Sequence, residues 1–189
     1  MFIQTETTPN PQVLKFLPGR ALLADGAGVR EFNNPQEALS SPLADALFRL
    51  ESVRRVFFAK DFLTVTKTQD ADWAVMKAPI LAAVMDHFVG GDALLCDEDG
   101  GVEEDVYEGA AADIVQEIKD LLDTRIRPAV AQDGGDILFS KFEPSTGTVW
   151  LHMRGACAGC PSSAATLKSG VENLLRHYIP EVTAVEQAL

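Results

Sequence analysis

The stretch GACAGCPSS, residues 155–163, decides how the C-terminal half folds, because it leads from a strand into a helix and carries two thiols three positions apart. Pro161 suits the first position of a helix, where its missing N–H would be unpaired anyway. Apolar residues recur at helical spacing from 164 to 178, and Pro180 ends the run. We therefore expect Cys157 and Cys160 in a loop of small residues at a helix N-terminus.

The two thiols form half of a metal site. Thiolate sulfur is a preferred ligand of zinc and of iron–sulfur clusters, and a cluster normally takes four cysteines. The third cysteine, Cys96, lies in a compositionally different region, and we expect it to be a buried small residue. The simplest completion of the site is a second copy of the chain. An isolated C-x-x-C pair is also compatible with two buried small hydrophobic residues.

The residues around the cysteines predict their environment. The positive end of a helix dipole lowers the pKa of a thiol and stabilises a negatively charged cluster. Gly155, Ala156, Ala158 and Gly159 leave no bulky side chain in the way, so we expect exposed thiols that a second subunit can approach.

Composition and charge exclude several classes of function. The net charge of −12 argues against binding to nucleic acid or to an anionic membrane surface. Three cysteines are not a disulfide framework and point to a reducing compartment. The amino terminus carries no recognisable signal or transit peptide, and no apolar run is long enough to span a membrane. We expect a cytoplasmic (bacterial) protein, or one of the mitochondrial matrix if this is a processed form.

The two halves of the chain predict an α/β (α+β) fold with two small domains, each a small sheet packed with helices. The expected domains are 1–90 and 110–189, joined by an acidic flexible linker at 91–109. Residues 97–108 carry seven acidic and no basic side chains, so like charges keep them extended.

In the N-terminal half, turn residues separate short apolar or alternating runs that predict strands at 2–6, 13–16, 53–58 and 62–67. Residues 24–35 read as a loop. A short helix is expected after the cap at Ser41, and a longer one over 72–88, kinked at Pro79 or beginning near Ala78. The apolar stripe of the longer helix, Met76 and Met85 included, is expected to be core.

In the C-terminal half, the expected order is helix, hairpin, cysteine loop, helix and strand. The first helix begins near Ile114 and should bend or stop near Pro128. The hairpin strands are 137–142 and 148–153, with His152 on the solvent side, and the last strand is 182–186. Turn and cap duties explain Asp133 and Asp136 better than a supporting role at a metal site.

At this point the chain resembles a known family. The segments 126–136 and 153–163 resemble the C-terminal domain of the NifU-like (Nfu-type) iron–sulfur cluster scaffold and carrier proteins. Residues 4–19, with QTE, TPNP, LKF and PG, resemble that family's N-terminal domain. Together the two matches cover nearly everything except the acidic linker.

The resemblance implies that Cys157 and Cys160 bind a labile [4Fe–4S] cluster, with [2Fe–2S] as the alternative. The cluster would be shared between two protomers of a homodimer and handed to apo iron–sulfur client proteins after loading by an upstream donor. The protein would then be a carrier and not an enzyme. Cys96 matches no position of the family motif.

Two other functions use the same cysteine pair. A thioredoxin-like dithiol oxidoreductase also places C-x-x-C before a helix, but the expected elements lack the βαβ setting of that motif. A zinc-binding module is the second alternative, with the cysteines joined by His152 and His177 or by a second copy.

Overall fold

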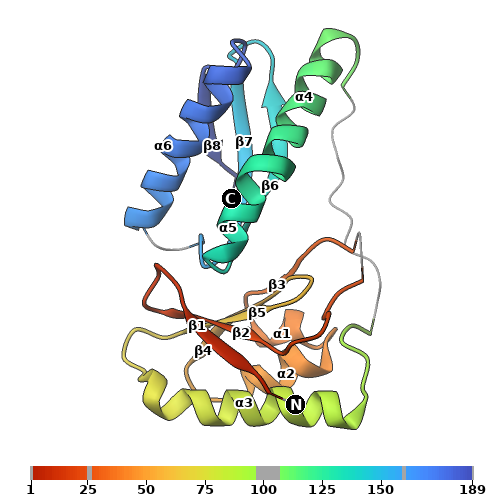
Figure 1. The fold of residues 1–189 in the computed structure, drawn as a ribbon, viewed down its shortest axis with the longest axis vertical. Helices are drawn as coiled ribbons and strands as arrows, with labels where there is room; N and C mark the ends of the chain where they lie inside the picture. The colour runs from red at the N-terminus through yellow and green to blue at the C-terminus, as the bar shows by residue number, and fades with distance from the viewer. Residues whose placement is uncertain (1, 25–26, 97–106, 159–160, 189) are drawn as a thin grey trace. The chain divides into compact units, whose positions relative to one another are not determined.

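The computed structural model describes residues 2–24, 27–96, 107–158 and 161–188. The chain forms two compact units, residues 1–100 and 101–189, and each contains one sheet with helices packed on it (Figure 1). The expected α+β class with two small domains is therefore confirmed. Most of the acidic linker lies outside the described residues, so the boundaries at 90 and 110 stay predictions.

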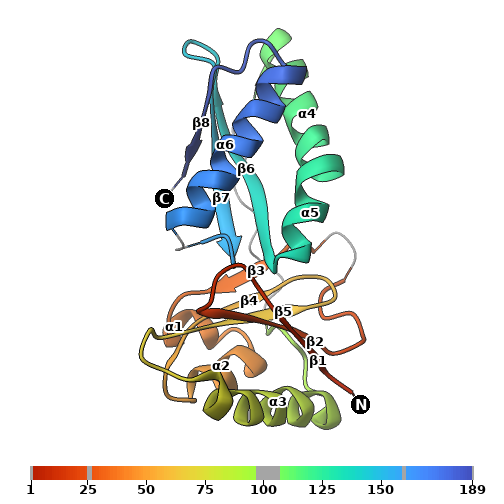
Figure 2. The same cartoon turned by 60° about the vertical axis from the view of Figure 1, so that its left-hand side comes forward.

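The N-terminal unit is a five-stranded sheet in the order β1-β2-β5-β4-β3, and all its neighbouring strands are antiparallel. All three of its helices cover the same face of this sheet (Figures 1 and 2). Its elements are β1 (Gln4–Thr7), β2 (Val13–Leu17), β3 (Arg30–Phe32), α1 (Pro35–Ala38), α2 (Pro42–Phe48), β4 (Val53–Phe58), β5 (Leu63–Lys67) and α3 (Trp73–Gly90).

Side-chain caps fix where these helices begin and end. The Ser41 hydroxyl accepts a hydrogen bond from the Ala44 N–H at 3.2 Å, as expected for a cap of α2. The Asp72 carboxylate accepts one from the Ala74 N–H at 2.9 Å at the start of α3. Gly91, in the left-handed region with φ 73°, ends α3.

The hairpin expected from residues 53–58 and 62–67 is confirmed, because β4 and β5 pair antiparallel.

Three expectations for this unit were wrong, and one of two alternatives for the long helix is excluded. The segment 24–35 is not all loop, because β3 pairs with β4 and α1 starts at Pro35. The long helix α3 begins at Trp73 and contains Pro79, which excludes a start near Ala78, whereas a kink at Pro79 stays a prediction. Met85 is exposed instead of buried in the core. Cys96 is exposed, and its N–H donates to the Ser40 carbonyl at 2.7 Å.

The C-terminal unit is a three-stranded sheet with its helices on one face (Figure 1). The strand β7 lies between β6, which is antiparallel to it, and β8, which is parallel to it. The order of elements is the expected one. The elements are α4 (Ala110–Leu121), a π-helical turn (Leu122–Ile126), α5 (Arg127–Gln132), β6 (Gly135–Glu143), β7 (Thr148–Gly155), α6 (Pro161–Tyr178) and β8 (Ala184–Gln187).

The helical stretch at the start of this unit was expected to bend or stop near Pro128. It does not stop there but continues to Gln132, and a bend stays a prediction. Pro128 lies in the first turn of α5, directly after the π-helical turn. The π-helical turn before it shifts the hydrogen-bonding register of the helix. The helix α5 then leads directly into the Gly134–Gly135 turn and β6.

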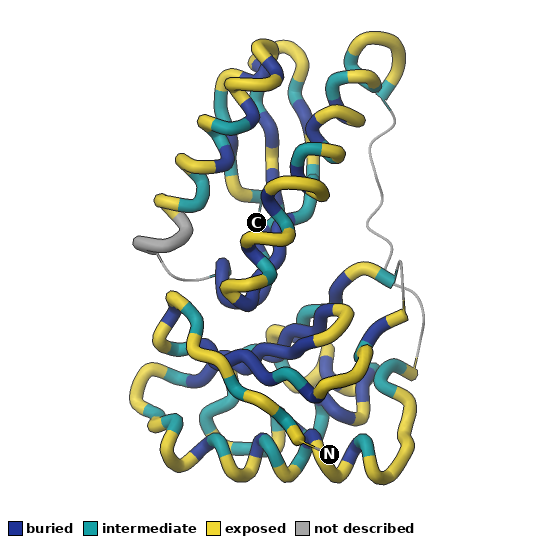
Figure 3. The backbone as a smooth tube through the Cα atoms, viewed as in Figure 1, coloured by how far each residue is buried: buried dark blue, intermediate teal, exposed yellow. Residues whose placement is uncertain are grey.

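The core of this unit lies between the apolar face of the helices and the inner face of the sheet (Figure 3). On β7 the residues Val149, Leu151 and Met153 are buried, as expected. Within the described residues, no helix combines the length and the apolar character needed to cross a membrane.

Candidate functional site

Cys157 lies in a tight turn that immediately follows β7. The strand ends at Gly155, whose φ of 63° few other residues adopt. The Ala156 N–H donates to the Gly134 carbonyl at 3.1 Å, and the Ala158 N–H donates to the Gly155 carbonyl at 3.1 Å. These bonds tie the start of the cysteine loop to the turn that precedes β6.

The Cys157 sulfur packs against Gly135, which pairs with Gly155 across the two strands. A Cβ atom at position 135 would overlap the Cys157 Sγ. It would also stand 2.9 Å from the Arg154 carbonyl oxygen and 3.0 Å from the Cys157 nitrogen. Two of these three atoms belong to the backbone and have little room to move. Only glycine therefore fits at position 135 while Cys157 keeps its place.

The Cys157 side chain points into the protein. It is 6% exposed and belongs to the core cluster of the C-terminal unit. The expectation of an exposed thiol was wrong for this cysteine. The close approach that the structure shows is that of the Cys157 sulfur to Gly135.

Burial also changes the chemistry of this thiol. Removal from water raises the pKa of Cys157 to about 12, and the nearby carboxylates of Asp133 and Asp136 add to the rise because they repel a thiolate. The expected lowering of a thiol pKa by the helix dipole concerns Cys160 next to the helix, which lies outside the described residues, so it stays a prediction. In the described arrangement Cys157 is a neutral thiol at physiological pH.

This raised pKa predicts slow alkylation. A rise from 9.0 to about 12 lowers the thiolate fraction near pH 8 by about a thousandfold, and only the thiolate reacts. In a Cys160→Ala variant, iodoacetamide should therefore modify Cys157 about a thousandfold more slowly in the native protein than in urea-unfolded protein. Peptide mass spectrometry measures both rates. The exposed Cys96 is the internal control and should react at similar rates in both states, while equal rates for Cys157 would contradict the burial.

An ion pair anchors the glycine turn from the other side. The Arg127 guanidinium donates to both carboxylate oxygens of Asp136 at 2.8 Å and to Asp123 at 2.8 Å. Asp136 is buried, and its carboxylate also accepts a hydrogen bond from the Ile137 N–H at 2.9 Å. Both carboxylate oxygens are therefore hydrogen-bonded, as a buried charge requires. The pair raises the pKa of Arg127, which stays protonated. Asp136 thus holds the start of β6 against α5. It lies within the strand, so its role is this ion pair and not the expected turn or cap duty.

Cys160, the second predicted ligand, lies outside the described residues, so the placing of both thiols around one centre stays a prediction. The helix after it does begin at Pro161, as expected. His177 is exposed, whereas His152 is half-buried and its pKa is lowered by burial and by Arg154. In the part of the chain that the structure describes, no three or more His, Cys, Asp or Glu side chains gather to hold a metal ion.

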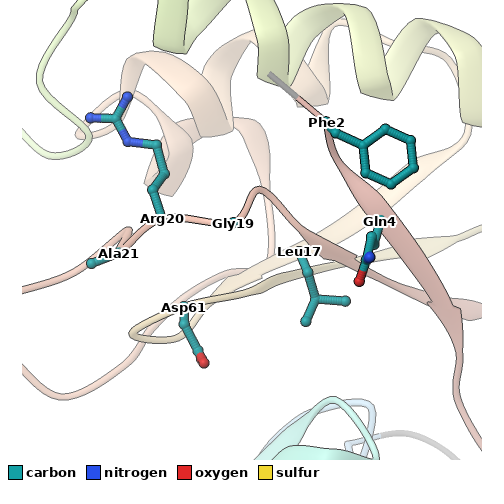
Figure 4. Close-up of a pocket in the computed structure, with 7 residues that line it drawn as sticks. All are labelled: Phe2, Gln4, Leu17, Gly19, Arg20, Ala21 and Asp61. Atoms are coloured by element: carbon teal, nitrogen blue, oxygen red, sulfur yellow. The ribbon is translucent and has the colours of Figure 1, made fainter.

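A hollow of about 440 Å³ in the N-terminal unit does not carry a second site. Gln4, Leu17 and Asp61 point toward the same side, but the Arg20 side chain points the other way (Figure 4), and its guanidinium lies 4.9 Å from the centre of the Phe88 ring. The charged groups therefore do not converge on one ligand. The lining residues are Phe2, Gln4, Leu17, Gly19, Arg20, Ala21 and Asp61.

Comparison with protein families gives two matches that together cover most of the chain. Residues 3–91 match the family described as "Scaffold protein Nfu/NifU N terminal". Residues 118–186 match the family described as "NifU-like domain". The cysteine pair lies inside the second match.

Individual relatives match over nearly the whole chain. It is 49% identical over 188 residues to "NifU-like protein 4, mitochondrial" of Arabidopsis thaliana, covering 99% of this chain and 66% of that protein. It is also 49% identical over 187 residues to "NFU1 iron-sulfur cluster scaffold homolog, mitochondrial" of Drosophila sechellia, covering 99% and 65%. The chain thus spans about two thirds of the length of these relatives. The solution structure of a NifU-like protein from Saccharomyces cerevisiae matches with a TM-score of 0.47 and 29% identity, over 50% of this chain and 84% of that one.

Proposed function

This chain belongs to the family of NifU-like (Nfu-type) proteins, and on that premise we propose that it is an iron–sulfur cluster scaffold and carrier. In this proposal a labile [4Fe–4S] cluster is the cargo. Cys157 and Cys160 of two copies supply its four thiolate ligands, and the cluster then passes to apo iron–sulfur proteins. The protein changes no covalent bond of a substrate, so it acts as a carrier and not as an enzyme.

The observation that carries the proposal is the incompleteness of the site in one chain. Each copy offers two cysteines three positions apart, and the described residues provide no further cluster of ligands. A cluster that is meant to stay in place is usually held by four ligands of one chain. Two ligands per copy require a second copy, and they leave the cluster open to the thiols of a client.

The buried state of Cys157 supports the lability of the cargo. The rise of its pKa from 9.0 to about 12 corresponds to a preference of about 4 kcal/mol for the neutral thiol. Loading therefore requires Cys157 to leave the core and lose its proton. When the cluster departs, the thiol takes up a proton and packs against Gly135 again, and this return favours release.

The helix α6 supports the charge balance of the loaded state. Cys160 directly precedes this helix of 18 residues, and the N-terminus of a helix carries partial positive charge. A cluster with four thiolates is negatively charged, and this end of α6 stabilises it. The net charge of −12 on the whole chain does not stabilise a negatively charged cluster, so the stabilisation comes only from this end of the helix.

Transfer is an exchange of ligands. Each cysteine thiol gives up one proton to solvent when it binds iron, and each thiolate of the client later displaces one of these cysteine sulfurs. The displaced thiolates take up protons again. The iron and sulfide keep their oxidation states throughout, so no oxidant or reductant is needed.

The test is anaerobic reconstitution of the full chain with sulfide and a mixture of ferrous and ferric iron, because a [4Fe–4S]²⁺ cluster contains two ions of each kind. A shared cubane predicts about two irons and two sulfides per chain, and a dimer by mass in solution. The loaded protein should then activate an apo [4Fe–4S] enzyme, whereas free iron and sulfide at the same concentration should do so more slowly. A fully loaded monomer with four irons would contradict the shared site.

The same experiment separates the other functions of the pair. A colourless protein with one zinc ion that does not yield to iron would indicate the zinc-binding module. A colourless protein with a well-defined dithiol potential would indicate the oxidoreductase.

The proposal also includes an upstream protein that donates the cluster to this chain. For the compartment, the mitochondrial names of the relatives favour the matrix over the bacterial cytoplasm.

A further inference from the structure

The side chain of Arg127 connects two elements of the C-terminal unit at the end of the sheet where the cysteine loop begins (Figure 1). Arg127 is the first residue of α5 and directly follows the π-helical turn. Its Nε and one terminal nitrogen donate to the two carboxylate oxygens of Asp136 in β6, each at 2.8 Å. We call these two bonds the Arg127 fork. The Asp136 side chain is 7% exposed, so the fork meets a buried charge.

The glycine turn between these two elements cannot hold its own shape. Gly134 has a φ of 80°, and neither Gly134 nor Gly135 has a side chain that could pack or bond. Glycine loses more conformational freedom on folding than any other residue, so such a turn needs anchors outside itself. Asp133 before the turn is exposed, whereas Asp136 after it is buried and bonded to Arg127. The Arg127 fork therefore anchors one end of the glycine turn.

The glycine turn also forms one wall of the place where the Cys157 sulfur packs. The Gly134 carbonyl accepts a hydrogen bond from the Ala156 N–H at 3.1 Å, and a Cβ atom at Gly135 would overlap the sulfur. Contacts as close as these are lost when one wall moves by a fraction of an ångström. Any freedom that the turn gains therefore loosens the packing of the sulfur.

We propose that Arg127 is a positioning residue of the cluster site. Its fork to Asp136 holds the glycine turn where the Cys157 sulfur packs, so Arg127 sets how often this thiol leaves the core. The effect on the thiol needs no cluster. The effect on cluster transfer rests on the proposed function, because a firm resting place favours the return of Cys157 and the departure of the cluster.

The geometry of the fork explains why the residue is arginine. A guanidinium is planar and offers parallel N–H groups, which match the two oxygens of a carboxylate and fix the angle between the partners. A lysine would keep the positive charge beside Asp136, but its ammonium group is a point charge and fixes no angle. Arg127→Lys therefore removes the positioning and keeps the charge, which makes it the main test variant.

The first experiment measures how fast iodoacetamide modifies Cys157 in the cluster-free full chain that carries Cys160→Ala, with a chelator present. Arg127→Lys should raise this rate at least about tenfold, because a looser turn raises the open fraction of the site. Arg127→Gln combined with Asp136→Asn leaves no buried charge without a partner and should also raise the rate. Arg176→Gln is the matched control, because it removes the same charge from an exposed ion pair of α6, and it should leave the rate unchanged.

A second control separates positioning from a general loss of stability. Ile118 is fully buried in α4, and Ile118→Val weakens the core while the Arg127 fork stays intact. In this variant the alkylation of Cys157 should stay slow. In Arg127→Lys the rate should be nearly independent of urea at low concentration, because a local opening exposes little surface. A rate that rises steeply with urea in both variants would show global unfolding and overturn the proposal.

The second experiment uses chains that keep both cysteines of the pair and are loaded anaerobically. Arg127→Lys should bind as much iron as the unchanged chain. Its cluster should reach an apo [4Fe–4S] enzyme at least about threefold more slowly in a single turnover, because a larger open fraction of the empty protein holds the cluster more tightly. General damage to the fold would instead lower the iron content.

Unchanged alkylation of Cys157 in both Arg127 variants overturns the proposal, and so does a transfer rate equal to that of the unchanged chain. A chain that never takes up iron contradicts the proposed function alone, because the alkylation rates decide the role of Arg127 without a cluster.

Discussion

Replacing either cysteine of the pair by serine, Cys157→Ser or Cys160→Ser, is expected to abolish iron–sulfur loading. Four thiolates hold the proposed shared cluster, and each substitution removes two of them because both copies change together. A serine hydroxyl stays protonated near pH 7 and is a poor ligand for iron. Iron and sulfide per chain after anaerobic reconstitution should fall from about two to below about one tenth of that value.

The third cysteine provides the control for this experiment. Cys96→Ser leaves the pair intact and should load and dimerise like the unchanged chain, because Cys96 is exposed in the other unit. Circular dichroism checks that each variant is folded, since Cys157 also contributes to the core. A brown, fully loaded Cys157→Ser or Cys160→Ser protein would show that the cluster has other ligands and would refute the proposed site.

Gly135→Ala is expected to have the second largest effect. The added Cβ would overlap the Cys157 sulfur and press on the Arg154 carbonyl and the Cys157 N–H, so the cysteine loop must move away from β6. Overpacking of this kind costs about 1–3 kcal/mol of unfolding free energy. The buried resting place of the thiol is lost as well, so alkylation of Cys157 should become faster by at least about tenfold.

Gly170→Ala is the matched control for this substitution. Gly170 lies within α6 and a Cβ there would meet no atom within 4 Å, so alanine should stabilise the helix by up to about 1 kcal/mol. Urea unfolding measures both variants. If Gly135→Ala were as stable as the unchanged chain and its Cys157 stayed unreactive, the close packing of Gly135 on the thiol would be refuted.

Much of the fold could be predicted from local patterns. The order helix, hairpin, loop, helix and strand of the C-terminal unit followed from spacing and turn residues, and the cap at Ser41 followed from residue type alone. The strand β3 could not be predicted, because three residues carry no period and only their pairing with β4 makes them a strand. The continuation of the helix past Pro128 depends on the π-helical turn before it, which no residue pattern indicated.

The candidate site divides in the same way. The sequence pointed to the cysteine pair through its spacing and its place before a helix. It did not predict that Cys157 is buried, because the residue that accommodates its sulfur is Gly135, 22 positions earlier and on another strand. The glycine pair at 134–135 was visible, but only the pairing of β6 with β7 brings it against the cysteine loop.

The concealed sulfur of Cys157 has a consequence for survival of the empty protein. Hydrogen peroxide and similar oxidants attack thiolates that they can reach, and they carry an exposed cysteine to sulfinic and sulfonic acids that cells do not generally repair. Cys157 is 6% exposed and carries a neutral thiol, so these oxidants find little thiolate and little accessible sulfur. If the protein is the proposed carrier, the buried packing therefore protects one of its two proposed ligands, Cys157, from oxidative damage while no cluster is bound.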